Sequence, residues 1–75
     1  MNKYKSERLM KIIINGKTEE LEVGTTIHKI LSSNDLKPDS VVVELNETVI
    51  ETEHYSKTVL KENDRLEVLS FVGGG

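Results

Sequence analysis

The dipeptide Asn15-Gly16 interrupts an apolar run and is followed by a segment in which Leu21 and Val23 alternate with glutamates. Asn-Gly favours the two-residue turn of a β-hairpin, because both residues accept positive φ angles. We therefore expect residues 10–15 and 17–23 to form two paired strands. Leu21 and Val23 are expected to face the core, while the acidic residues of the second strand form a solvated face.

The kinds of apolar residue also favour strands over helices. Of the 27 apolar residues in this chain of 75, 14 are isoleucine or valine, and alanine is absent. β-Branched residues suit strands, and alanine is the strongest helix former. A chain of this length has room for one small domain and little interior for a deep catalytic pocket.

One helix is expected after the hairpin. Ile27, Ile30 and Leu31 fall at the spacing of one helical stripe, Thr25 or Thr26 can cap its start, and Pro38 prevents its renewal.

Three more strands are expected, over residues 41–45, 49–50 and 65–72. The irregular segment 51–60 is expected to be anchored by three apolar side chains: Tyr55, Val59 and Leu60. The most apolar strands, the first and the last, are expected side by side in mid-sheet. The fold class is therefore α+β, a roll with a mixed sheet of four to five strands and one main helix packed across it.

The end of the chain carries the strongest functional signal. Residues 73–75 are three glycines directly after an apolar strand. Glycine lacks a Cβ atom, and three extended residues reach roughly 10 Å. Such a tail can carry a carboxylate into a narrow channel of another protein. We predict a flexible extension over residues 1–9, a folded domain over residues 10–72, and a flexible tail over residues 73–75.

An apolar patch is expected beside this tail. Leu69 and Phe71 share the face of Glu67 rather than that of the core, and Ile13 lies on the outer face of the first strand. If the two strands are neighbours, Ile13, Leu69 and Phe71 form an exposed patch of the kind that often marks partner surfaces.

The chain resembles the ThiS family of sulfur carriers, which are ubiquitin-like β-grasp proteins. The resemblance covers residues 10–75 and rests on Met10-Lys11-Ile12, Asn15-Gly16, Val43-Glu44-Leu45-Asn46, Asn63-Asp64-Arg65-Leu66-Glu67 and Phe71-Val72-Gly73-Gly74-Gly75. The chain departs from the family pattern in residues 1–9, which are extra, and in the acidic segment 51–53, where members often carry a proline and a basic residue.

The resemblance implies a carrier that is not itself an enzyme. An E1-like adenylyltransferase of the ThiF type would use ATP to adenylate the carboxylate of Gly75. A sulfur donor would then convert it to a thiocarboxylate, and a thiazole synthase of the ThiG type would take the sulfur for the thiazole ring of thiamin. The resemblance further implies partner contacts along the tail and the patch: Ile13, Leu69, Phe71, Val72, Gly73 and Gly74.

Two other functions remain open from the sequence. A sulfur carrier like the small subunit of molybdopterin synthase would share the fold and the tail but serve another acceptor. A ubiquitin-like protein modifier, or an interaction module with an inert tail, would also fit.

Charge and residue content argue against several other classes. The net charge is −3 and the pI about 5.3, so no basic patch for nucleic acid is expected. The chain lacks cysteine, and His28 and His54 belong to different elements, so we expect no metal and no bound cofactor. No apolar run approaches the roughly 18 residues of a membrane span, and a cytoplasmic location is expected.

Overall fold

The computed structural model describes residues 8–71, which form five strands, one α-helix and two short 3₁₀ helices. In chain order they are β1 (Leu9–Ile14), β2 (Lys17–Glu22), α1 (Ile27–Ser33), η2 (Pro38–Ser40), β3 (Val41–Leu45), β4 (Thr48–Ile50), η3 (Thr52–His54) and β5 (Arg65–Ser70). The strands and the α-helix follow the predicted order, with β1 and β4 beginning one residue earlier than expected and β5 ending two residues earlier. The two 3₁₀ helices were not predicted.

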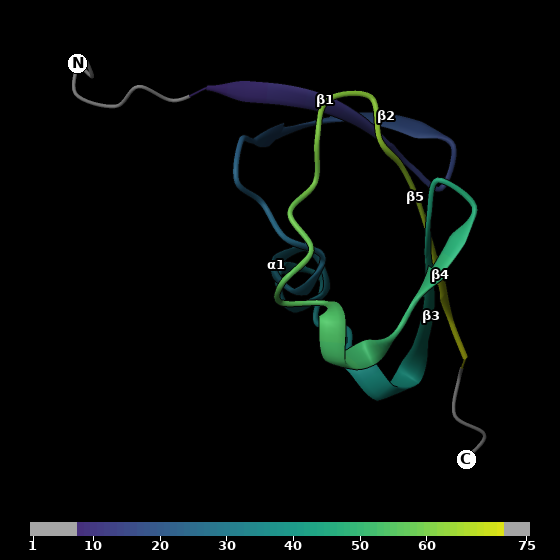
Figure 1. Cartoon of the computed structure of the whole chain (residues 1–75). Helices are drawn as coiled ribbons and strands as arrows, with labels where there is room; N and C mark the ends of the chain where they lie inside the picture. Colours follow the sequence, from purple (N-terminus) through teal and green to yellow (C-terminus); the bar gives the residue numbers. More distant parts are fainter. Residues whose placement is uncertain (1–7, 72–75) are drawn as a thin grey trace.

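The five strands form one mixed sheet in the order β2-β1-β5-β3-β4 (Figure 1). β1 and β5 are parallel neighbours in its centre, as predicted, and the other pairs are antiparallel. A parallel pair needs a long crossover connection, and here α1, β3 and β4 all lie within that connection. Figure 1 shows α1 and the segment before β5 on the same side of the sheet.

The β1–β2 hairpin has the predicted turn. Asn15 and Gly16 have φ angles of 50° and 83°, and Ile14 pairs with Lys17 across them. These angles fit the type I′ turn, whose twist matches that of the flanking strands. The expectation for Val23 was wrong: β2 ends at Glu22, and the Val23 side chain is 58% exposed. Of the two residues expected to face the core, Leu21 and Val23, only Leu21 packs against it.

The core lies between one face of the sheet and α1. Its buried side chains are Met10, Ile12, Ile27, Ile30, Leu31, Val41, Val43, Tyr55, Leu60 and Leu66. The helical stripe predicted from the spacing of Ile27, Ile30 and Leu31 is therefore confirmed. The Thr26 side chain caps α1 by accepting a hydrogen bond of 3.1 Å from the Lys29 amide.

The segment between β4 and β5 closes the core beside α1. Tyr55 and Leu60 are buried, as predicted, but Val59 is 50% exposed. The Leu60 amide donates to the Thr25 carbonyl, and Val59 forms a β-bridge with Thr26. This extended pairing turns neighbouring side chains to opposite sides, so that Leu60 points inward and Val59 outward.

The turn between β3 and β4 stores backbone strain that can be relieved. Asn46 and Glu47 have φ angles of 51° and 72°, a conformation that disfavours glutamate. We expect Glu47→Gly to raise the free energy of unfolding by about 0.5–1 kcal/mol, measured by urea denaturation. Glu47→Gln removes the same charge but keeps the strain, so a glycine variant no more stable than the glutamine variant would contradict this prediction.

Candidate functional site

The last described part of the chain is held firmly to the sheet. β5 pairs with β3 from Leu66, opposite Leu45, to Ser70, opposite Val41. One residue further, the Phe71 amide donates a hydrogen bond of 3.0 Å to the Ser40 carbonyl. The backbone that leads into residues 72–75 is therefore anchored as far as Phe71.

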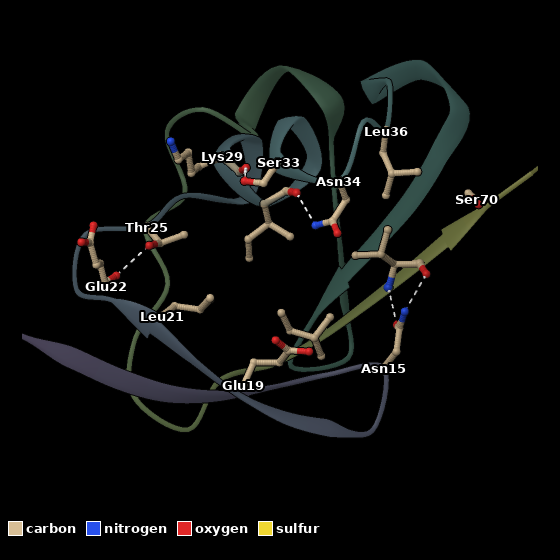
Figure 2. A pocket seen from close by; sticks show the side chains of 13 residues that line it. Asn15, Glu19, Leu21, Glu22, Thr25, Lys29, Ser33, Asn34, Leu36 and Ser70 are labelled. Atoms are coloured by element: carbon tan, nitrogen blue, oxygen red, sulfur yellow. Dashed lines mark hydrogen bonds between the residues drawn. The ribbon is translucent and has the colours of Figure 1, made fainter.

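A side chain from the hairpin turn holds the other edge of β5. The Asn15 carboxamide accepts a hydrogen bond from the Val68 amide at 2.8 Å and donates one to the Val68 carbonyl at 3.2 Å (Figure 2). The Asn15 amide itself donates to the Leu66 carbonyl. The side chain thus continues the β1–β5 pairing at the point where β1 turns away.

We expect Asn15→Gly to lower the free energy of unfolding by about 1–2 kcal/mol, because glycine keeps the turn but cannot make the two bonds to Val68. Amide exchange at Val68 should also become faster, which NMR can measure. Asn63→Gly is the matched control. Asn63 also has a positive φ, of 69°, but its side chain makes no hydrogen bond within residues 8–71. An equal loss of stability in both variants would contradict the prediction.

Three exposed apolar side chains gather on the outer face near the end of β5. Leu69 is 63% exposed and Phe71 51% exposed, as predicted. Val42 is also exposed and lies directly opposite Leu69 in the β3–β5 register. We call Val42, Leu69 and Phe71 the outer patch. Contiguous exposed apolar residues of this kind mark interaction surfaces.

The prediction that Ile13 belongs to the same patch as Leu69 and Phe71 was wrong. It lies on the same face of the sheet, but the parallel register places it beside Arg65. Leu69 lies four residues further along β5, or about 13 Å away in an extended strand. The alternation of apolar residues indicated the face correctly, but the register decided which residues meet.

Charged side chains border the outer patch. Val42 and Leu69 line a shallow hollow together with Arg65 and three carboxylates, those of Glu44, Glu47 and Glu67. The excess of negative charge favours a partner that brings basic side chains to this rim.

The other predicted site residues, Val72, Gly73, Gly74 and Gly75, lie outside the described residues. The sequence analysis predicted neither the place of Val42 in the outer patch nor the two hydrogen bonds between the Asn15 side chain and Val68. The alternation of Val41, Val43 and Leu45 already turned Val42 outward, but its pairing with Leu69 needed the register. The Asn-Gly signal predicted the turn and contained nothing about a side-chain bond to β5.

Within residues 8–71, no group of three or more histidine, aspartate or glutamate side chains is arranged to hold a metal ion. No helix in this part of the chain combines the length and the apolar character needed to cross a membrane.

A mixed sheet with its first and last strands parallel in the centre and one helix across a face defines a ubiquitin-like β-grasp protein. The outer patch of this domain lies where the chain leaves β5. Within the β-grasp proteins, this chain belongs to the ThiS family, whose sequence model matches residues 12–75.

Named relatives agree with this assignment. The sulfur carrier protein ThiS of Bacillus subtilis is 38% identical over 63 residues, which are 83% of this chain and 96% of the relative. The crystal structure of a thiamine biosynthesis protein (ThiS) from Geobacter metallireducens superposes with a TM-score of 0.73 at 33% identity, covering 88% of this chain and 100% of that one.

A longer relative is a thiazole synthase from Magnetococcus marinus, 41% identical over 66 residues. The match covers 88% of this chain but only 20% of that protein. The chain therefore spans about a fifth of the length of the thiazole synthase that it matches.

Proposed function

We propose that this chain is a sulfur carrier for the thiazole ring of thiamin and that it carries the sulfur as a thiocarboxylate on Gly75. The observation that carries the proposal is the extent of the family match, which runs through the terminal glycines to residue 75. The carrier is a co-substrate in this reaction: other proteins activate its carboxylate and consume its sulfur.

The chemistry follows from the weak reactivity of a carboxylate. A carboxylate oxygen of Gly75 attacks the α-phosphorus of ATP, pyrophosphate leaves, and an acyl-adenylate forms. A sulfide-equivalent donor then attacks the carbonyl carbon, and AMP leaves with the oxygen that bound phosphorus. The product is a thiocarboxylate, in which one carboxylate oxygen has been replaced by sulfur. ATP and the sulfur donor bind to the activating enzyme, so the carrier needs no cofactor of its own.

The folded domain supplies the docking surface and a fixed base for the tail. β3 and the Asn15 side chain hold β5 from both edges, which limits how far Phe71 can move relative to Val42 and Leu69. A partner that binds Leu69 and Phe71 therefore also positions residues 72–75 at its own active site. Such fixed positioning lowers the entropy cost of bringing the carboxylate to the reactants.

Two partners follow from the proposal. The first is an E1-like adenylyltransferase of the ThiF type, which would thread the glycine tail and form the acyl-adenylate. The second is a thiazole synthase of the ThiG type. A segment similar to this chain occurs within the thiazole synthase of Magnetococcus marinus, and this supports thiazole synthase as the sulfur acceptor. Both reactions take place in the cytoplasm in this proposal.

Intact-mass spectrometry tests the proposal directly. The protein, prepared with Gly75 as its free C-terminus, is incubated with ATP, a ThiF-type enzyme and a sulfide source. We expect a mass increase equal to the difference between a sulfur and an oxygen atom, localised to the peptide that ends at Gly75. Omitting ATP should abolish the increase.

The acceptor is tested next with the thiocarboxylate form. We expect thiazole synthase to consume it and the large subunit of molybdopterin synthase to leave it intact. The reverse preference would assign the chain to molybdopterin synthesis. Absence of a mass increase, with an enzyme active on another carrier, would contradict sulfur transfer, and conjugates of higher mass in cell extracts would indicate a protein modifier.

A further inference from the structure

Among the strands of residues 8–71, β2 is an edge strand with one unpaired side. It pairs with β1 along all six of its residues, and within residues 8–71 no other strand adds to it. An exposed strand edge presents backbone donors and acceptors that can pair with another extended chain. The question is what kind of chain this edge accepts.

The hairpin register identifies the free backbone groups. In an antiparallel pair, residues alternate between those bonded to the partner strand and those whose N–H and C=O groups point away from it. Lys17 is bonded to Ile14 next to the turn, and the Val23 amide still donates to the Arg8 carbonyl at 2.9 Å. The alternation between these two points directs the backbone groups of Thr18, Glu20 and Glu22 to the open side. The Glu22 carbonyl already accepts hydrogen bonds from Thr25, so Thr18 and Glu20 are the residues with both groups available.

An apolar groove runs beside this edge, between β2 and α1 (Figure 2). It has a volume of about 470 Å³, and five apolar side chains are among its lining residues: Ile14, Leu21, Ile30, Leu36 and Val68. Four of these are only partly buried, and Ile30 is buried. A strand added to β2 would place alternate side chains over this groove, because β2 directs Leu21 to the same side.

The charged side chains near the free edge of β2 determine which charge a peptide that binds there should carry. Glu19 shares the groove side of β2 with Leu21, and Glu20 and Glu22 share the other face of the strand. Glu22 also lines the end of the groove, where Lys29 is the one cation among the lining residues. A second copy of β2 would bring like charges together, which disfavours pairing between two copies of this chain. Lysine or arginine side chains on an incoming strand would meet these carboxylates instead.

We propose that the free edge of β2 binds an extended, basic peptide segment of a partner protein as a sixth strand. Thr18 and Glu20 supply the backbone pairing, and aliphatic side chains of the peptide enter the groove beside Leu21. Its alternate basic side chains lie on the other face of the sheet, where they meet Glu20 and Glu22. Main-chain pairing of this kind gives affinity, while side-chain pockets give specificity. The free edge belongs to β2, and the groove lies on the α1 side of the sheet, whereas the outer patch lies on the other face. One molecule can therefore bind a peptide at this edge while the outer patch and the tail engage another protein.

The test uses the synthetic peptide acetyl-KVKIKVK-amide and ¹⁵N-labelled protein. Amide exchange measured by NMR gives a distinctive readout, because β1 already protects the amides of Glu19 and Leu21. We expect saturable binding that slows exchange at Thr18 and Glu20 and shifts signals of groove residues such as Ser33. Two probe controls, acetyl-EVEIEVE-amide and acetyl-KVKPKVK-amide, should fail to protect these amides, because the first repels the glutamates and proline interrupts strand pairing.

Matched charge reversals on the protein complete the test. We expect Glu20→Lys with Glu22→Lys to weaken binding of acetyl-KVKIKVK-amide by about tenfold or more. Glu51→Lys with Glu53→Lys changes the net charge equally at exposed positions beyond β4, and it should leave binding within about twofold.

Four results would overturn the proposal. They are the absence of saturable binding, equal binding of the proline peptide, signal changes centred on Leu69 and Phe71, and protection of Thr18 and Glu20 that rises with protein concentration without peptide. The last would show that a second copy of this chain occupies the edge. None of these results depends on sulfur transfer, so they leave the proposed function untouched.

Discussion

Replacing Gly74 with valine is expected to abolish activation of the C-terminal carboxylate and to leave the folded domain intact. Valine adds a β-branched side chain, which cannot pass through a channel that admits only backbone. Because misplacing a reacting group by an ångström can cost about a hundredfold in rate, we expect ATP–pyrophosphate exchange with the ThiF-type enzyme to fall by at least that factor.

Two variants separate a blocked tail from a general defect. Gly74→Ala adds a smaller side chain and should show an intermediate rate. Thr48→Val introduces valine at an exposed position of β4, at the other end of β3 from Ser70, and should leave exchange unchanged. Urea denaturation should give the same midpoint for Gly74→Val as for the parent protein. Normal exchange with Gly74→Val would show that no narrow channel receives the tail.

Leu66→Ala is expected to cause the largest loss of stability, about 2–5 kcal/mol. Leu66 is fully buried at the centre of the sheet, where β5 pairs with both β1 and β3. Removing its side chain loses apolar burial and leaves a cavity that close-packed neighbours fill only in part. A total stability of about 5–15 kcal/mol is typical of small domains, so a loss of this size would remove a large share of it.

Leu69→Ala makes the same chemical change three residues further along β5, on the exposed face. We expect it to alter the free energy of unfolding by less than about 0.5 kcal/mol, since surface substitutions rarely do more. It should instead lower kcat/KM for thiocarboxylate formation several-fold, through weaker docking. Urea denaturation and the sulfur-transfer assay together measure both effects. Equal stability losses in Leu66→Ala and Leu69→Ala would contradict the assignment of inner and outer faces, and unchanged transfer with Leu69→Ala would remove the outer patch from docking.

Local sequence signals predicted the elements of the fold well. The Asn15-Gly16 turn and the helix over Ile27–Ser33 depend on residues that are close in the chain, and both were confirmed. The central position of β1 and β5 also followed from the sequence, because strands that are apolar on both faces need cover on both sides.

Besides Ile13, two predictions were wrong about which way a single side chain faces. In the sequence, Val23 continues the alternation of apolar and acidic residues in β2. In the structure the strand ends at Glu22, two residues before Gly24, which has a φ of 99°. Val59 and Leu60 are both apolar neighbours, and only the bridge to Thr26 decides that Leu60 is the buried one. Apolar character alone cannot choose between two adjacent side chains.

The sequence by itself determined the class of fold, the faces of the strands and the family, since alternation, turn residues and the end of the chain are all local in sequence. The tertiary structure alone decided which distant residues meet. It placed Val42 opposite Leu69, moved Ile13 beside Arg65, joined the Asn15 side chain to Val68 and left one edge of β2 open beside an apolar groove. The physical reason is register: strands far apart in sequence can slide past one another by two residues without changing which face is apolar, and only the packed sheet selects one alignment.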